Sequence, residues 1–374
     1  MLNRVSANSP LAGLVEASPA ARRNIMTITQ NKFTKAAIDE RVARRSPLQK
    51  LLGRPEVGAL VGAIVLFVFF ALVSPTFTQP NALATVLYGS STIGIMAVGV
   101  SLLMIGGEFD LSTGVAVISS ALTASMFSWY FSTNVWVGVI LALLVSLAIG
   151  FINGWILMKT KLPSFIVTLA TFLMLTGLNL GLTRLIGGSV SSPSISTMDG
   201  FDTARGVFAS SVTIAGIDVK ITVFIWIALV AVATWVLMRT RVGNWIFAVG
   251  GDANAARAVG VPVKATKIGL FMGVGFCGWI LGMHNLFAFD TVQSGEGVGN
   301  EFLYIIAAVI GGCLLTGGYG SAVGGAIGAF IFGMANKGIV YAQWNPDWFK
   351  FFLGLMLLLA TIVNLIVKRR AELK

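Results

Sequence analysis

The stretch AVGGDANAARAVGVPV, residues 248–263, is short and polar, and long apolar segments stand on both sides of it. Asp252 is a favourable N-cap residue, because its carboxylate can accept hydrogen bonds from the first free amides of a helix. Gly260 stands where a C-cap glycine is expected, and Pro262 discourages continuation of the helix. The pattern predicts a helix of about two turns between two membrane spans, flanked by Arg239, Arg241, Lys264 and Lys267.

The segments around this stretch are typical of a polytopic helical membrane protein. Of the 374 residues, 56% are hydrophobic and 11% are charged, whereas a soluble domain has about 25% charged residues. The apolar runs are continuous and approach the roughly 20 residues that a membrane-crossing helix needs, which excludes a barrel of short alternating strands. We expect an all-α bundle of about ten transmembrane helices, near 57–73, 84–105, 113–132, 135–158, 163–183, 221–238, 267–289, 302–316, 321–341 and 348–367.

The distribution of charge predicts the orientation of these spans. With the N-terminus in the cytoplasm, every strong positive cluster falls on one side, as the positive-inside rule requires; these clusters are the basic tail 1–56, Lys159 with Lys161, the loop 239–266 with Lys267, and 368–374. The external loops 184–220 and 290–301 are neutral and acidic. We therefore expect one transmembrane domain over 57–367, both termini in the cytoplasm, and no nucleic-acid partner. The tail is interpreted as a cytoplasmic segment or, alternatively, as one that binds anionic lipid headgroups.

The sequence lacks the chemistry of an energy source. It contains no G-x-x-x-x-G-K-[ST] motif for ATP, and the middle of the expected spans holds essentially no ionisable residue, although an ion-coupled carrier usually needs one. The single histidine, His284, is interpreted as a packing residue. Cys277 and Cys313 have no metal-like spacing, so no metal site is expected. Uphill transport would therefore need energy from another subunit.

The segment GGEFDLSTG, residues 106–114, predicts a helix break between the second and third spans. Gly106 and Gly107 can end one helix, and Asp110 or Ser112 can cap the next. Two interpretations stay open. The segment is either a tight charged turn at the membrane surface, or an irregular stretch that lines the transport path or contacts a partner.

Polar and aromatic residues within the spans are candidates for a path that a hydroxylated solute could follow. The alternative role for the polar ones is hydrogen bonding between helices, which is the common use of such side chains in membrane helices. The candidates are Asn153, Phe165, Thr168, Thr171, Phe172 and Asn336.

Two further patterns concern the packing of the bundle. Glycines four residues apart predict close helix approach, in the pairs 150/154, 177/181, 269/273, 278/282, 320/324 and 324/328. A weak internal similarity relates 97–107 to 308–318, and a second relates Asn153 and Pro163 to Asn336 and Pro346. The two offsets, 211 and 183, disagree, so an internal repeat stays an open expectation.

Over roughly 55–367 the chain resembles the permease subunits of bacterial ABC importers for ribose, xylose, arabinose and related monosaccharides. Three stretches carry the resemblance: GGEFDLSTG, NGWILMKTKLPSFIVTLATF at 153–172, and AVGGDANAARAVGVPV. The departures from the family pattern are mild, namely the inserted Glu108, Asp252 where asparagine is frequent, and Val261 in place of isoleucine.

This resemblance implies a bacterial inner-membrane subunit that is not itself an enzyme. Two permeases, identical or related, would work with ATPase subunits that hold ATP and magnesium, and with a periplasmic sugar-binding protein. The helix that couples the permease to the ATPase would include Asp252, Ala255, Ala256, Arg257 and Gly260. No cofactor is expected in this chain. A branched-chain amino-acid permease, an ion-coupled secondary carrier and a passive channel remain alternatives, and the sequence does not identify the sugar.

Overall fold

The computed structural model describes residues 55–372, and describes side chains for 56–362. The expected N-terminal tail therefore lies almost wholly outside the described residues. The elements, in chain order, are α3 (Pro55–Val73), the 3-10 turn η2 (Pro75–Thr78), α4 (Pro80–Ile105), α5 (Thr113–Phe131), α6 (Val135–Thr160), α7 (Ser164–Gly187), α8 (Phe201–Phe208), β1 (Ser211–Ile214), β2 (Ile217–Lys220), α9 (Ile221–Arg239), α10 (Arg241–Gly251), α11 (Ala253–Ala258), α12 (Val263–Phe289), α13 (Asn300–Ile310), α14 (Ala322–Tyr341), the 3-10 turn η3 (Pro346–Trp348) and α15 (Phe349–Glu372).

Eight helices within the described part of the chain are long and apolar enough to cross a membrane. They are α3, α4, α5, α6, α7, α9, α12 and α14. The tenth expected span, 348–367, overlaps α15, which is not among these eight helices. The eighth expected span, 302–316, differs from the structure, because α13 has 11 residues and a helix of that length rises about 16 Å, roughly half of a bilayer core. Gly311 and Gly312 end α13 early, and the continuous apolar composition concealed that end.

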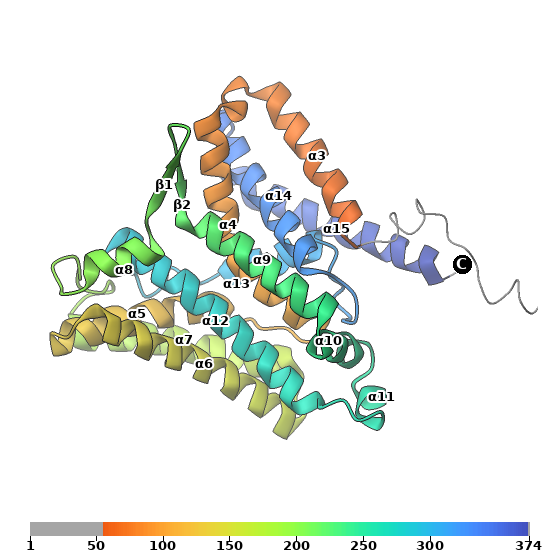
Figure 1. Ribbon diagram of the computed structural model, residues 1–374, viewed down its shortest axis with the longest axis horizontal. Coiled ribbons are helices and arrows are strands. Elements are labelled where there is room, and N and C mark those ends of the chain that lie inside the picture. Colours follow the sequence, from red (N-terminus) through yellow and green to blue (C-terminus); the bar gives the residue numbers. More distant parts are fainter. Residues whose placement is uncertain (1–54, 373–374) are drawn as a thin grey trace, which may run out of the picture. The chain divides into compact units, whose positions relative to one another are not determined.

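Helices α4 and α12 form the centre of the bundle. Helix α12 packs against α4, α5 and α6, and α4 packs also against α9 and α14. Figure 1 shows α5, α6 and α7 together along one side, with α12 between them and α4, α9 and α14. The middle of α4 is buried on every side, including Ile95, Met96, Ala97 and Val98. A helix that is apolar all round is expected in such a central position.

The expected glycine pairs divide into two groups. Glycines of the first group lie where two helices cross closely. A Cβ added at Gly150 would come 2.4 Å from the Phe271 carbonyl oxygen, and one added at Gly282 would come 2.7 Å from the Val117 carbonyl oxygen. Gly324 and Gly328 approach α13 in the same way. In contrast, a Cβ at any of Gly177, Gly181, Gly269 and Gly273 would meet nothing within 4 Å. Spacing alone therefore identified glycines that permit helix contact together with glycines that face open space.

The loop 184–220 is ordered and contains structure that an all-α prediction lacks. It holds α8 and the antiparallel hairpin of β1 and β2. It is also joined to the loop after α12, because the Ser192 amide donates to the Val292 carbonyl at 2.9 Å and the Ser294 amide to the Val190 carbonyl at 3.0 Å. These two loops form one layer at the end of the bundle where α12 terminates.

His284 connects that layer to the spans. Its Nδ1 lies 2.9 Å from the carbonyl oxygen of Phe208 on α8. Its Nε2 lies 2.9 Å from the hydroxyl of Tyr88 on α4. Because a carbonyl can only accept, Nδ1 carries the proton, and Tyr88 donates to Nε2. The buried ring is thus satisfied on both nitrogens, as its interpretation as a packing residue requires.

The chain breaks out of helix after α4 and again after α13, and the same pattern of backbone hydrogen bonds ends both helices. At the end of α4, the amides of Gly106, Gly107 and Glu108 donate to Leu102, Met104 and Leu103, respectively; at the end of α13, the amides of Gly311, Gly312 and Cys313 donate to Ala307, Val309 and Ala308. Gly107 and Gly312 both have positive φ, +83° and +94°. The offset, from Gly106 to Gly311, is 205 residues. Neither offset expected from the sequence, 211 or 183, aligns these ends, because similar apolar residues match in several registers.

Candidate functional site

The short helix α11 begins and ends as its sequence predicts. The Asp252 Oδ1 atom accepts hydrogen bonds from the amides of Asn254, at 2.8 Å, and Ala255, at 3.0 Å. The bonds from Ala255 and Asn254 lower the pKa of this carboxyl, because they stabilise its ionised form. At the other end Gly260 has φ +85°, and the Val261 amide donates to the Ala256 carbonyl at 3.0 Å. The N-cap and the glycine after the helix are therefore confirmed.

One face of α11 is buried and other parts of it are exposed. Ala256 is buried in a small apolar cluster with Val249 of α10 and Val263 of α12. Ala255 and Ala258 are exposed, and so is Val259, which directly follows the helix and is 80% exposed. Of the expected coupling residues, Asp252, Ala255, Arg257 and Gly260 are exposed and Ala256 is not. Ala256 seats the helix, and the exposed apolar face is available to another protein.

The helix break between α4 and α5 lies inside the bundle. Glu108, Asp110 and Ser112 are all buried, with exposures of 8%, 4% and 0%. The charged side chains of this turn are therefore covered by other parts of the protein. The break is thus enclosed by other helices, and the sequence could not show this because both interpretations of the segment require the same glycine and capping residues.

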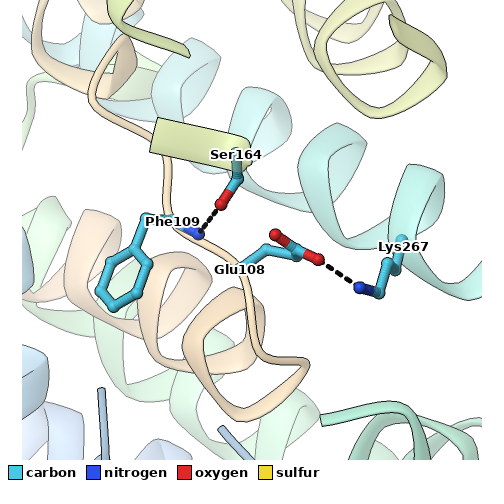
Figure 2. Close-up of polar contacts among 4 residues, drawn as sticks. All are labelled: Glu108, Phe109, Ser164 and Lys267. Atoms are coloured by element: carbon cyan, nitrogen blue, oxygen red, sulfur yellow. Dashed lines mark hydrogen bonds and ion pairs between the residues drawn. The ribbon is translucent and has the colours of Figure 1, made fainter. Parts of the chain in front are cut away.

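Helices α7 and α12 hold this break, α7 through two backbone amides of the break and α12 through the side chain of Glu108. The Phe109 amide donates to the Ser164 hydroxyl at 3.1 Å, and the Leu111 amide donates to the Thr168 hydroxyl at 3.1 Å. Both hydroxyls belong to the start of α7. Figure 2 shows Glu108 directed toward Lys267 of α12, with which it forms an ion pair. The break is thus tied to α7 on one side and to α12 on the other.

A chain of buried hydrogen bonds continues from the break into α6 and α7. Asp110 Oδ1 accepts from the amide of Ser112 at 2.8 Å and from its hydroxyl at 2.5 Å. The side-chain amide of Asn153 donates to the Ser112 hydroxyl oxygen at 3.0 Å, and the Thr171 hydroxyl donates to Asn153 Oδ1 at 2.6 Å. We call Asp110, Ser112, Asn153 and Thr171 the break network. Its members satisfy one another in a setting where an unpaired polar group is costly.

The structure thus brings together the residues expected along a solute path and the residues of the helix break. Asn153, Thr168 and Thr171, expected along a solute path, hold the break formed by Gly106, Gly107, Asp110 and Ser112. The remaining path candidates lie elsewhere. Phe165 is 56% exposed on α7, Phe172 is half-buried on α7, and Asn336 is half-buried on α14.

Three carboxylates are buried among the described residues, namely Glu108 and Asp110 at the break and Glu301 on α13. Asp110 lies in the break network, and Glu301, expected in an exposed external loop, is 3% exposed at the start of α13. The Gly299 amide donates to both carboxylate oxygens of Glu301, at 3.1 and 3.2 Å. Glu301 stabilises the first turn of α13 by accepting from an otherwise free amide. Its position two residues after Gly299 is a local signal for capping, but its burial depends on the packing of α13 against α5.

Replacement of Asn153 by leucine is expected to lower the stability of the protein by about 1–3 kcal/mol, because Ser112 and Thr171 would each lose a buried partner. Thermal unfolding in detergent measures this change. The matched control is Asn336→Leu, since Asn336 is half-buried and no hydrogen bond of its side chain is found within the described residues. Equal unfolding midpoints for the two variants would show that the break network contributes nothing.

Comparison with known families gives the chain its class. Residues 82–361 match the family model described as "Branched-chain amino acid transport system / permease component". The chain belongs to this family. The match includes the helix break, the break network and α11, so these features lie within the shared part of the sequence.

The curated relatives of this permease include proteins named for sugar import. The ribose import permease protein RbsC of Escherichia coli K12 is 31% identical over 312 residues, covering 83% of this chain and 93% of the relative. The galactose/methyl galactoside import permease protein MglC of the same strain is 30% identical over 322 residues, covering 83% and 94%. The probable ABC transporter permease protein YphD is 29% identical over 319 residues. No solved structure matches the chain.

Proposed function

We propose that this permease is the membrane-spanning subunit of an ABC importer that moves a monosaccharide into the cell. The observation that carries the proposal is the similarity to permeases named for ribose and galactose import, which extends over most of both chains. The same relatives favour a sugar over a branched-chain amino acid, despite the wording of the family description. The sequence has no P-loop, so ATP and magnesium would be bound by a separate ATPase subunit.

In this proposal the permease lies in the bacterial inner membrane with both termini in the cytoplasm. The basic residues around α11, namely Arg239, Arg241, Lys264 and Lys267, support a cytoplasmic position for that helix. Helices α9 and α12 both run between the α10–α11 end and the end that carries the hairpin and α8 (Figure 1). The layer formed by the loops 184–220 and 290–301 would then face the periplasm and receive a sugar-binding protein.

Helix α11 is the proposed contact with the ATPase. Its exposed apolar face, formed by Ala255, Ala258 and Val259, fits a groove on another protein better than it fits water. Arg257 and Asp252 flank this face. The cluster of Val249, Ala256 and Val263 fixes α11 to α10 and α12, so that movement of the ATPase reaches the spans and alternates access to the path. A second permease, identical or related, would complete the path, to which Phe165, Phe172 and Asn336 are proposed to contribute.

Reconstitution tests this proposal. The permease, its genetically neighbouring cassette ATPase and secreted binding protein would be placed in proteoliposomes and assayed with radiolabelled ribose, xylose, arabinose, galactose and leucine. We expect one sugar to accumulate only when ATP is enclosed with the ATPase, and an ATPase variant that cannot hydrolyse ATP to abolish accumulation. Accumulation of leucine alone would instead support the branched-chain alternative, uptake driven by an ion gradient without ATP would support a secondary carrier, and flux without ATP or gradient would support a channel.

A further inference from the structure

Three chain segments meet backbone to backbone beside α11. They are the end of α4 at Gly107, the end of α10 at Gly250, and the α13–α14 connection at Gly317 and Gly318. The Gly318 amide donates a hydrogen bond to the Ile105 carbonyl at 2.8 Å, which links the α13–α14 connection directly to α4. We call these four glycines the glycine junction.

The junction has no room for side chains. A Cβ at Gly250 would lie 1.7 Å from the Ile105 carbonyl oxygen and 2.7 Å from the Gly318 amide nitrogen. A Cβ at Gly317 would lie 2.6 Å from the Gly107 Cα and 2.7 Å from the Gly250 oxygen. The neighbours in every case are backbone atoms, which cannot move aside by a change of rotamer. The three segments are therefore in direct contact, with no flexible group between them.

One side of the junction leads to α11. Gly250 is two residues before Asp252, which caps α11, and the Asp252 amide donates to the Ala248 carbonyl at 3.1 Å. Val249, the neighbour of Gly250, belongs to the apolar cluster that seats Ala256. A displacement of α11 therefore acts on Gly250 through a continuous, packed backbone.

The other side of the junction leads to both helix breaks. Gly107 begins the break that is tied to α7 by Ser164 and to α12 by Lys267. Gly317 and Gly318 follow the break that ends α13, which repeats the hydrogen bonding at the end of α4. At the junction, the end of α10 that precedes α11 therefore contacts the segments that follow α4 and α13.

We infer that the glycine junction transmits the movement of α11 to the two helix breaks, and that Gly250 is the positioning residue on the α10 side. The inference rests on the proposed function, because it assumes that an ATPase moves α11. The physical reason is that close-packed contacts transmit displacement, whereas a soft contact absorbs it. A methyl group at Gly250 would separate α10 from α4 and interrupt this transmission, without touching the exposed face of α11.

The test compares Gly250→Ala with Gly251→Ala in the reconstituted complex. A Cβ at Gly251 would meet nothing within 4 Å, and both substitutions replace a glycine of α10 by a better helix former. We expect both variants to copurify with the ATPase and to support its basal hydrolysis. For Gly250→Ala we expect sugar uptake per ATP hydrolysed to fall at least tenfold, and for Gly251→Ala to stay at the wild-type value. Wild-type uptake per ATP in Gly250→Ala would overturn the inference.

A measurement on the wild-type complex covers the case in which Gly250→Ala does not fold. Amide hydrogen exchange would be followed with and without a non-hydrolysable ATP analogue. We expect exchange at Gly318, whose amide bonds to Ile105, to change together with exchange in α11. A change confined to α11 would overturn the inference. If instead the wild-type complex imports no sugar in the presence of ATP, the proposed function fails, and that result is separate from either outcome for the junction.

Discussion

Replacement of Val259 by glutamate is expected to separate the permease from its ATPase and to abolish ATP-driven uptake. Val259, which directly follows α11, is 80% exposed and forms the exposed apolar face together with Ala255 and Ala258. In the proposed complex this face is buried, and burial of a valine side chain is worth about 1.5 kcal/mol or more. A carboxylate buried there without a partner adds a further cost. Together these effects predict affinity for the ATPase that is lower by about 100-fold or more, since each 1.4 kcal/mol is tenfold.

Copurification of the ATPase with the tagged permease measures this effect, and uptake in proteoliposomes measures its consequence. The matched control is Val212→Glu, the same substitution at an exposed valine of the hairpin, which lies at the opposite end of α9 from α10 and α11 (Figure 1). The control should bind the ATPase as the wild type does. If Val259→Glu also retains the ATPase at wild-type affinity, α11 is not the docking helix. A bulky residue at Ala256 would be a weaker test, because Ala256 is buried against Val249 and Val263 and its replacement would unseat α11 itself.

Replacement of Gly328 by alanine is expected to destabilise the bundle by about 1–3 kcal/mol, the usual cost of overfilling a packed interior. A Cβ at Gly328 would lie 1.9 Å from the Ala307 carbonyl oxygen and 2.9 Å from the Gly311 amide nitrogen. Helices α13 and α14 would therefore have to move apart. This separation would also strain the break that ends α13, because Gly311 is part of it.

Gly273→Ala provides the contrast. Gly273 is also inside a helix, but a Cβ there would meet nothing within 4 Å, so the substitution should raise helix stability by up to about 1 kcal/mol. Thermal unfolding in the same detergent measures both variants. The expected order of midpoints is Gly273→Ala at or above wild type, and Gly328→Ala clearly below it. The reverse order would mean that the close approach of α13 and α14 contributes nothing to stability.

Local sequence patterns were sufficient to predict both ends of α11. Asp252 and Gly260 define the ends of a helix through hydrogen bonds and a backbone angle that involve residues within a few positions. Their effect can therefore be predicted without knowledge of the fold. Which face of that helix is free depends on Val249 and Val263, and a helix of six residues carries too short a pattern to indicate its buried side.

The helix break shows that local sequence patterns do not predict contacts between distant parts of the chain. Glycines and capping residues predicted that the chain breaks at 106–114, but the partners of the break lie far along the chain, at Asn153, Ser164, Thr168 and Lys267. Polar side chains on different spans carry no signal of whether they face a solute path or one another. The packing of α5, α6, α7 and α12 made that choice, and it made Asn153, Thr168 and Thr171 supports of the break.

The class of protein, the positions of most spans and the two ends of α11 follow from local patterns, because apolar run length, charge distribution and capping act over short distances along the chain. The burial of the break and of Glu301, the end of α13 after 11 residues, and the meeting of Gly107, Gly250, Gly317 and Gly318 depend on the packing of the helices. These features arise from contacts between residues that are distant in the chain, where the packing of whole helices rather than any local preference determines the neighbours.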